Sequence, residues 1–212
     1  MSATLEQIAG AALSSLETVR ASYDIARLAI ERDIPGDLVE CGVFASAQAA
    51  AMAKALMDYE VPPRGFTAEH RRVHLFDSFT GIPAPTAEDG AWPHPVGQSK
   101  CDLATVQRFM RAWGIDESLL VYHVGMFDKT IPAVLRTTTP QSVRLERIAV
   151  LRLDGDLYAS TKVCIEHLYP LVSPGGWIIV DDFALPGARQ AVIESGIANG
   201  PIYIQKQPPE KP

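Results

Sequence analysis

The sequence predicts a single α/β domain in which a mostly parallel sheet is covered by helices on both faces. Apolar, β-prone segments alternate with helical segments along most of the chain, which is typical of parallel sheets. The strand segments are nearly continuous in apolar residues, which indicates burial on both faces. With 212 residues, 47% hydrophobic and 21% charged, the chain is long and apolar enough to bury a sizeable core.

The first elements follow from apolar spacing and from turn residues. Residues 4–33 are predicted as one helix, because apolar residues recur there at three-to-four spacing. Pro35-Gly36 ends this helix, and 37–43 is expected to be the first strand. An alanine-rich helix over 45–59 and a second strand over 73–79 are predicted next.

A long irregular stretch, 80–100, follows the second strand. It holds four prolines and three glycines, and its length predicts a lid or binding loop. The remaining expected elements are helix 102–113, strands 119–125 and 147–154, a helix near 159–171, strand 177–183, a helix near 186–196 and strand 201–205.

These elements suggest three parts of the chain. Residues 1–33 form a helical N-terminal extension, which we expect to cover the sheet or to contact a second subunit in a homo-oligomer. Residues 34–205 form the main domain, and the tail 206–212 is expected to fray.

Charge and cysteine content exclude several classes of protein. A net charge of −6 argues against binding to nucleic acid or to an anionic membrane. No apolar run approaches the roughly 20 residues that span a bilayer, and the start of the chain lacks a secretion signal. Three cysteines without CxxC spacing indicate neither a disulfide framework nor a zinc site, so a cytoplasmic location is expected.

Carboxylates gather at the predicted strand ends, which is where parallel sheets bind ligands. Any one of them is more often a helix cap or a turn residue, but the set indicates a site. The strand-end residues are Glu40 with Gly42, Asp77-Ser78, Gly125, Asp154, and Asp181-Asp182.

The first two strand ends have the geometry of a site for an adenosine-containing cofactor. A glycine turn opens a helix, and Asp77 at the next strand end can accept hydrogen bonds from ribose hydroxyls. The turn "ECGVFASA" lacks the G-x-G-x-x-G pattern, because Phe44, Ala45 and Ala47 stand where glycines are needed. A pyrophosphate cofactor such as NAD is therefore disfavoured, and S-adenosylmethionine is favoured.

The fourth and fifth strand ends predict a cation site. Neighbouring parallel strands lie about 5 Å apart, so Asp154 would meet Asp181 and Asp182 in one crevice. Such carboxylates repel one another unless they are protonated or bind a cation, and oxygen ligands favour Mg²⁺, Ca²⁺ or Mn²⁺ over zinc. The alternative is that Asp182 and Asp156 cap the helices that follow them.

Histidine and serine patterns indicate no other chemistry. The five histidines lack metal-binding spacing, although His123 near a strand edge could act as a base. The serines lack the G-x-S-x-G pattern of a hydrolase.

Five stretches, which follow one another in the family's order, resemble the bacterial macrocin O-methyltransferase family. Members of this family use S-adenosylmethionine and a metal to methylate sugar hydroxyls of antibiotics and related glycosides. The resemblance implies a Rossmann-like class I methyltransferase fold with a small-molecule acceptor. The matching stretches are "IPGDLVECGVF", "LFDSFTGIPAP", "VGMFDKTIP", "LRLDGDLYASTKVCIEHLYPLVSPGGWIIVDDF" and "PGARQAV".

The resemblance also implies roles for individual residues. Glu40 and Gly42 would line the methionine end of the cofactor, and Asp77 would bind its ribose. Residues 125–128, with Gly125, Phe127 and Asp128, would border the adenine, and Phe44 and Ser78 would complete the cofactor contacts. Asp154, Asp181 and Asp182 would hold a Mg²⁺-like hard divalent cation, with Asp154 as the base and Asp156 behind it.

Two stretches depart from the family pattern. Ala45-Ser46-Ala47 replaces a glycine pair, and Met126 replaces an aromatic residue. The function implied is methylation of a hydroxyl, on the sugar of a glycosylated natural product. A catechol-type or other small-molecule O-methyltransferase, and a non-catalytic protein of the same fold, are the alternatives.

Overall fold

A six-stranded sheet forms the centre of the protein, whose computed structural model describes residues 2–12, 14–60, 70–136, 144–197 and 203–207. The strand order is β3-β2-β1-β4-β5-β6. The first five strands are parallel, and β6 runs antiparallel to β5, which confirms the mostly parallel α/β fold. The strands are β1 (Asp37–Cys41), β2 (Val73–Asp77), β3 (Leu120–Val124), β4 (Ile148–Leu153), β5 (Val172–Val180) and β6 (Tyr203–Gln205).

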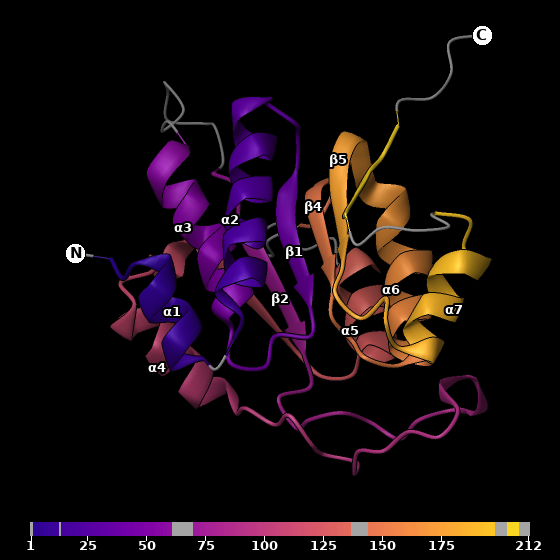
Figure 1. Ribbon diagram of the computed structural model, residues 1–212. Coiled ribbons are helices and arrows are strands. Elements are labelled where there is room, and N and C mark those ends of the chain that lie inside the picture. Colours follow the sequence, from indigo (N-terminus) through magenta and orange to yellow (C-terminus); the bar gives the residue numbers. More distant parts are fainter. Residues whose placement is uncertain (1, 13, 61–69, 137–143, 198–202, 208–212) are drawn as a thin grey trace, which may run out of the picture.

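Helices cover both faces of this sheet (Figure 1). Adjacent strand residues point to opposite faces, so Leu38 belongs to one apolar cluster and Val39 to the other. The first cluster packs under α1 (Leu5–Ala11), α2 (Leu16–Glu31), α3 (Ala47–Tyr59) and α4 (Leu103–Ala112), and the second under α5 (Phe127–Arg136), α6 (Tyr158–Leu168) and α7 (Pro186–Glu194).

The N-terminal segment differs from the single helix that was predicted over 4–33. It forms α1, which ends at Ala11, and α2, which Ser15 caps with its Oγ accepting from the backbone N–H of Glu17 at 3.2 Å. Ile8 and Val19 are both fully buried, and they pack in the same core cluster as Met52 of α3. The division of the chain at residue 33 remains a prediction.

Three further differences concern the second half of the chain. Helix α5 was not predicted, because Pro132 inside it resembles a helix breaker. Strand β5 begins at Val172 and includes the Pro174–Gly176 turn signal, and it ends at Val180, before the two aspartates. Lys206 of the predicted tail exchanges backbone hydrogen bonds with Gly175 and Gly176, whereas 208–212 lie outside the described residues.

Within the described part of the chain, none of the helices is both long and apolar enough to cross a bilayer. Three 3₁₀ turns, η1 (Ala87–Asp89), η2 (Glu117–Leu119) and η3 (Tyr169–Leu171), connect the main elements.

Candidate functional site

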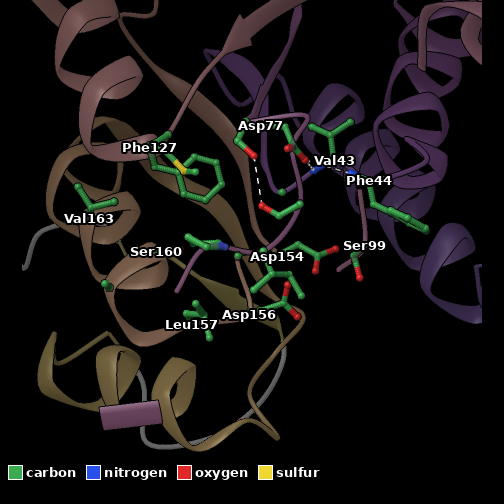
Figure 2. Close-up of a pocket in the computed structure, with 18 of the residues that line it drawn as sticks. Val43, Phe44, Asp77, Ser99, Phe127, Asp154, Asp156, Leu157, Ser160 and Val163 are labelled. Atoms are coloured by element: carbon green, nitrogen blue, oxygen red, sulfur yellow. Dashed lines mark hydrogen bonds between the residues drawn. The ribbon is translucent and has the colours of Figure 1, made fainter. Parts of the chain in front are cut away.

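A cavity of about 490 Å³ opens at the carboxyl ends of the strands. Its walls come from the segments that follow β1, β2, β3 and β4, from α6, and from the loop 80–100. Figure 2 shows Phe44 and Phe127 on opposite sides of this cavity, with Asp154 and Asp156 between them. Ser14, from the connection between α1 and α2, also lines the cavity, a contribution that sequence reasoning missed.

Asp77 holds the turn after β1 in place. Its Oδ2 accepts hydrogen bonds from the backbone N–H groups of Val43 and Phe44, at 2.7 and 3.2 Å. Its Oδ1 accepts from the N–H of Phe79 at 2.7 Å. Because each carboxylate oxygen can accept two hydrogen bonds, Asp77 retains capacity for a ligand hydroxyl.

The turn after β1 carries two residues in the left-handed region, where glycine is preferred. Phe44 has φ 43° and Ser46 has φ 65°. Ser46 lies in the stretch Ala45-Ser46-Ala47, and its buried Oγ has no hydrogen-bond partner among the described residues. The turn therefore keeps the conformation that glycines would favour, although it lacks them at these positions.

Gly42 brings the ends of β1 and β4 into close contact. A Cβ atom at this position would lie 1.6 Å from the carbonyl oxygen of Asp154, and the φ of Gly42 is +94°. The backbone N–H of Asp154 donates to the carbonyl of Cys41 at 2.8 Å. The absence of a side chain at Gly42 thus sets the position of Asp154 at the cavity.

Three carboxylates meet beside the cavity, as predicted. Oxygens of Asp154, Asp181 and Asp182 all lie within 4.8 Å of one another. A hard divalent cation with ligands at about 2.0–2.6 Å can bridge oxygens at such separations. Burial, and repulsion from the neighbouring carboxylates, raise the pKa values of Asp154 and Asp182 well above the usual range.

The predicted alternative, in which Asp156 and Asp182 cap the following helices, is wrong. The N-cap residues of α6 and α7 are Leu157 and Leu185. Asp182 accepts a hydrogen bond from the backbone N–H of Asp156 at 2.8 Å, which links the two strand ends. Asp156 has φ 60°, and burial is the main reason that its pKa is raised to about 6.

Arg152 is a second residue of this region that sequence reasoning missed. It is 1% exposed inside β4, and its guanidinium contacts three carboxylates: Glu40 Oε1 at 3.0 Å, Asp154 Oδ2 at 2.8 Å and Asp181 Oδ1 at 2.7 Å. A buried arginine must be paired, and the only sequence signal was a charge within an apolar strand. Arg152 therefore offsets part of the negative charge of this cluster.

The structure separates the predicted site residues into two groups. Glu40, Gly125, Asp181 and Asp182 do not line the cavity; Glu40 lies within β1 and is fully buried. The predicted residues that line it are Gly42, Phe44, Asp77, Ser78, Phe127, Asp128, Asp154 and Asp156.

Glu40 and His123 differ in what they could contribute. Burial raises the pKa of Glu40 to about 8, and its buried Oε2 has no hydrogen-bond partner among the described residues. His123 stacks on Phe76 and pairs with His74 Nδ1 at 2.9 Å. His123 does not line the cavity, and burial lowers its pKa to about 3, so it is not placed to act as the alternative base.

The geometry fits both the cofactor and the cation that the sequence suggested. A volume of about 490 Å³ lies in the usual range for a small-molecule site. Gly42 and Phe44 of the turn after β1 line the cavity, and Asp77 Oδ1 retains acceptor capacity. The adjacent oxygen donors of Asp154, Asp181 and Asp182 suit a hard cation.

Comparisons with known proteins agree with this geometry. The profile of the macrocin O-methyltransferase (TylF) family matches residues 15–199. Mycinamicin III 3''-O-methyltransferase of Micromonospora griseorubida is 32% identical over 195 residues, which cover 84% of this chain and 69% of the relative.

Another relative and a solved structure extend the likeness. The 8-demethyl-8-(2,3-dimethoxy-alpha-L-rhamnosyl)-tetracenomycin-C 4'-O-methyltransferase of Streptomyces olivaceus is 35% identical over 165 residues, covering 75% of this chain and 57% of the relative. The structure of the O-methyltransferase NovP is similar with a TM-score of 0.72 and 27% identity, covering 92% of this chain and 81% of that one.

Proposed function

The chain belongs to the macrocin O-methyltransferase family, and we propose that, as an S-adenosylmethionine-dependent O-methyltransferase, it methylates a sugar hydroxyl of a glycosylated natural product. The observation that carries this proposal is the carboxylate trio of Asp154, Asp181 and Asp182 beside the cavity. The Streptomyces olivaceus relative, named for a rhamnosyl-bearing tetracenomycin C, supports a sugar acceptor.

The cofactor would occupy the part of the cavity formed by the ends of β1, β2 and β3. Gly42 and Phe44 would border its methionine portion, and Glu40, which was predicted there, lies fully buried outside the cavity lining. Asp77 would bind a ribose hydroxyl through Oδ1, which keeps one acceptor position free. Phe127 and Asp128 would border the adenine, and Ser78 would complete the cofactor contacts, whereas Gly125 lies outside the cavity lining.

The acceptor hydroxyl would lie over the carboxylate trio. When bound, S-adenosylmethionine supplies the methyl group, and a hard divalent cation held by Asp154, Asp181 and Asp182 supplies a Lewis acid that lowers the pKa of the hydroxyl. In the proposed transfer the hydroxyl oxygen would bond to the methyl carbon as the carbon–sulfur bond breaks, its proton would pass to Asp154, and S-adenosylhomocysteine would be left.

Asp154 is the proposed base, and Asp156 supports it. The Oδ2 atom of Asp154 is bonded to Arg152, so Oδ1 is the atom that would accept the proton. Asp156, which also lines the cavity, would orient the acceptor or receive the proton next.

Calorimetry tests cofactor binding directly. We expect S-adenosylhomocysteine to bind the protein both with and without Mg²⁺. If neither S-adenosylhomocysteine nor S-adenosylmethionine binds under either condition, the cofactor assignment is wrong and a non-catalytic role is favoured.

Asp181→Asn tests the cation site, and Asp24→Asn, on the exposed face of α2, is its matched control. We expect Asp181→Asn to abolish Mg²⁺-dependent turnover and to weaken Mg²⁺ binding, while S-adenosylhomocysteine affinity stays close to that of the unsubstituted protein. Activity that persists in this variant and resists EDTA would contradict the metal site.

A panel of acceptors tests the substrate class. Glycosides with free sugar hydroxyls and simple catechols are incubated with S-adenosylmethionine and Mg²⁺, and methylated products are identified by mass spectrometry. We expect methylation on the sugar; preferential methylation of catechols would favour the catechol-type alternative.

A further inference from the structure

The loop 80–100 leaves and re-enters the fold at a narrow neck. The N–H of Ile82 donates to the carbonyl of Gln98 at 2.9 Å, and the N–H of Gly97 donates to the carbonyl of Ile82 at 2.8 Å. Residues 83–96 between these bonds form a lobe. Figure 1 shows the loop crossing the edge of the sheet where the strands end and reaching toward α7.

The tip of this lobe is anchored by Asp89. Residues 84–88 are exposed, yet Asp89 is 4% exposed. Its Oδ2 accepts hydrogen bonds from the N–H and the hydroxyl of Thr86, at 2.7 and 3.1 Å. Its Oδ1 accepts from the N–H of Tyr158, the first residue of α6, at 2.7 Å.

Asp89 therefore supplies the cap that α6 lacks in its own sequence. The N-cap residue of this helix is Leu157, whose side chain cannot accept a hydrogen bond. A free N–H group at a helix start is favourably paired with a carboxylate, which also interacts well with the helix dipole. The first turn of α6 is thus joined to the lobe by one short hydrogen bond.

Gly187 makes room for this contact. A Cβ atom at Gly187, in the first turn of α7, would lie 1.9 Å from Asp89 Oδ1 and 3.0 Å from the backbone nitrogen of Tyr158. The lobe, the start of α6 and the start of α7 therefore meet at one point. These helices begin just after the acidic strand ends, 154–156 and 181–182.

We propose that Asp89 is a positioning residue, whose carboxylate, seated against Gly187, fastens the lobe 83–96 onto the first turns of α6 and α7 and so closes the acceptor side of the site. This inference rests on the proposed function. Among the cavity residues of the loop, Ile82 and Ser99 lie at or beside the neck, which has its own hydrogen bonds, and Pro83 and Ala84 begin the lobe. Release of Asp89 should therefore weaken acceptor binding more than cofactor binding.

Two substitutions release the contact in different ways. Asp89→Ala removes both acceptor oxygens, whereas Gly187→Ala keeps the carboxylate and fills the space that it occupies. Gly10→Ala in α1 is the matched control, because a Cβ there meets no described atom within 4 Å. Asp89→Asn is the conservative variant, since its amide oxygen can still accept from Tyr158.

Hydrogen–deuterium exchange of peptides from 83–96 is the primary measurement. Loss of one helix cap corresponds to about a five- to tenfold change in an opening equilibrium, so we expect exchange in the lobe to accelerate about that much in Asp89→Ala and Gly187→Ala. Gly10→Ala should leave it unchanged, and Asp89→Asn should fall between. The double variant should match Asp89→Ala, because the carboxylate oxygen that the methyl group added at Gly187 would strike is gone.

Steady-state kinetics test whether the contact of Asp89 with α6 and α7 matters for acceptor binding. We expect the acceptor KM to rise about fivefold or more in both single variants, with S-adenosylhomocysteine affinity within about twofold and partial recovery in Asp89→Asn. If exchange in the lobe is unchanged, Asp89 does not fasten the lobe. If exchange is faster but the acceptor KM is unchanged, the fastened lobe does not close the acceptor side of the site. Because hydrogen–deuterium exchange needs no turnover, it tests the contact of Asp89 even if the proposed function is wrong.

Discussion

A single added methyl group at Gly42 tests how closely the ends of β1 and β4 approach each other. In Gly42→Ala the new Cβ would lie 1.6 Å from the carbonyl oxygen of Asp154, and Cβ contacts below 3.0 Å are essentially never seen. The two backbone segments must therefore separate by about 1.4 Å at this point. No side-chain rotation can relieve a contact between a Cβ atom and a backbone oxygen.

The loss of unfolding free energy in Gly42→Ala has two contributions. A residue with a side chain at φ +94° costs about 1–2 kcal/mol in backbone strain. Forcing apart packed backbone adds about 1–3 kcal/mol, the usual range for overpacking. We expect Gly42→Ala to lower the free energy of unfolding by about 2–5 kcal/mol, a large share of the stability of a typical domain.

Alanine substitutions at two other glycines, measured by urea titration, separate the backbone strain from the cost of forcing packed backbone apart. Gly196 has φ +68° and its added Cβ meets no described atom within 4 Å, so Gly196→Ala should cost only the backbone strain, about 1–2 kcal/mol. Gly10→Ala has neither problem and should gain about 0.5–1 kcal/mol from helix propensity. If Gly42→Ala is no more destabilising than Gly196→Ala, the close approach at Asp154 is wrong.

Three more predictions use the same titration. Ser46→Gly should stabilise the protein by about 1 kcal/mol, because it removes left-handed strain and a buried hydroxyl without a described partner; no gain would contradict this. Arg152→Met should cost about 3–5 kcal/mol, partly recovered by Mg²⁺, because it leaves a carboxylate cluster without its buried partner. Burial raises the pKa values of Glu40 and Asp182 to about 8, so the folded state retains protons that the unfolded state has released. The free energy of unfolding of the metal-free protein should therefore fall between about pH 6.5 and about pH 8. A rise over this range would contradict the raised pKa values. Below about pH 6.5 the lowered pKa of His123 acts in the opposite direction.

Much of the sheet could be predicted from the sequence because its signals are local. Segments such as 73–77 and 148–153 are apolar along most of their length, and turn residues mark their ends. The meeting of Asp154 with Asp181 and Asp182 followed from strand adjacency, which the βαβ spacing predicts. The local sequence pattern and the sheet topology were therefore enough to predict that these three carboxylates meet.

The contacts that could not be predicted are those made between distant segments. Arg152 looks like an ordinary charge in a strand until Glu40 on the neighbouring strand is placed beside it. Asp89 lies in a loop with no periodicity, and its partner is a backbone N–H of a helix start 69 positions away. Neither contact has a signature in the residues around it, because each depends on how the sheet brings remote ends together.

The pairing of β1 with β4 at the centre of the sheet has a consequence for the order of folding. Glu40 and Arg152 are neighbours in space, yet 112 positions separate them along the chain. The ribosome thus releases β1, β2 and β3 well before β4 exists, and one side of β1 must wait unpaired. Such long-range closure is slow, so the nascent N-terminal half presents an open strand edge until its partner is made.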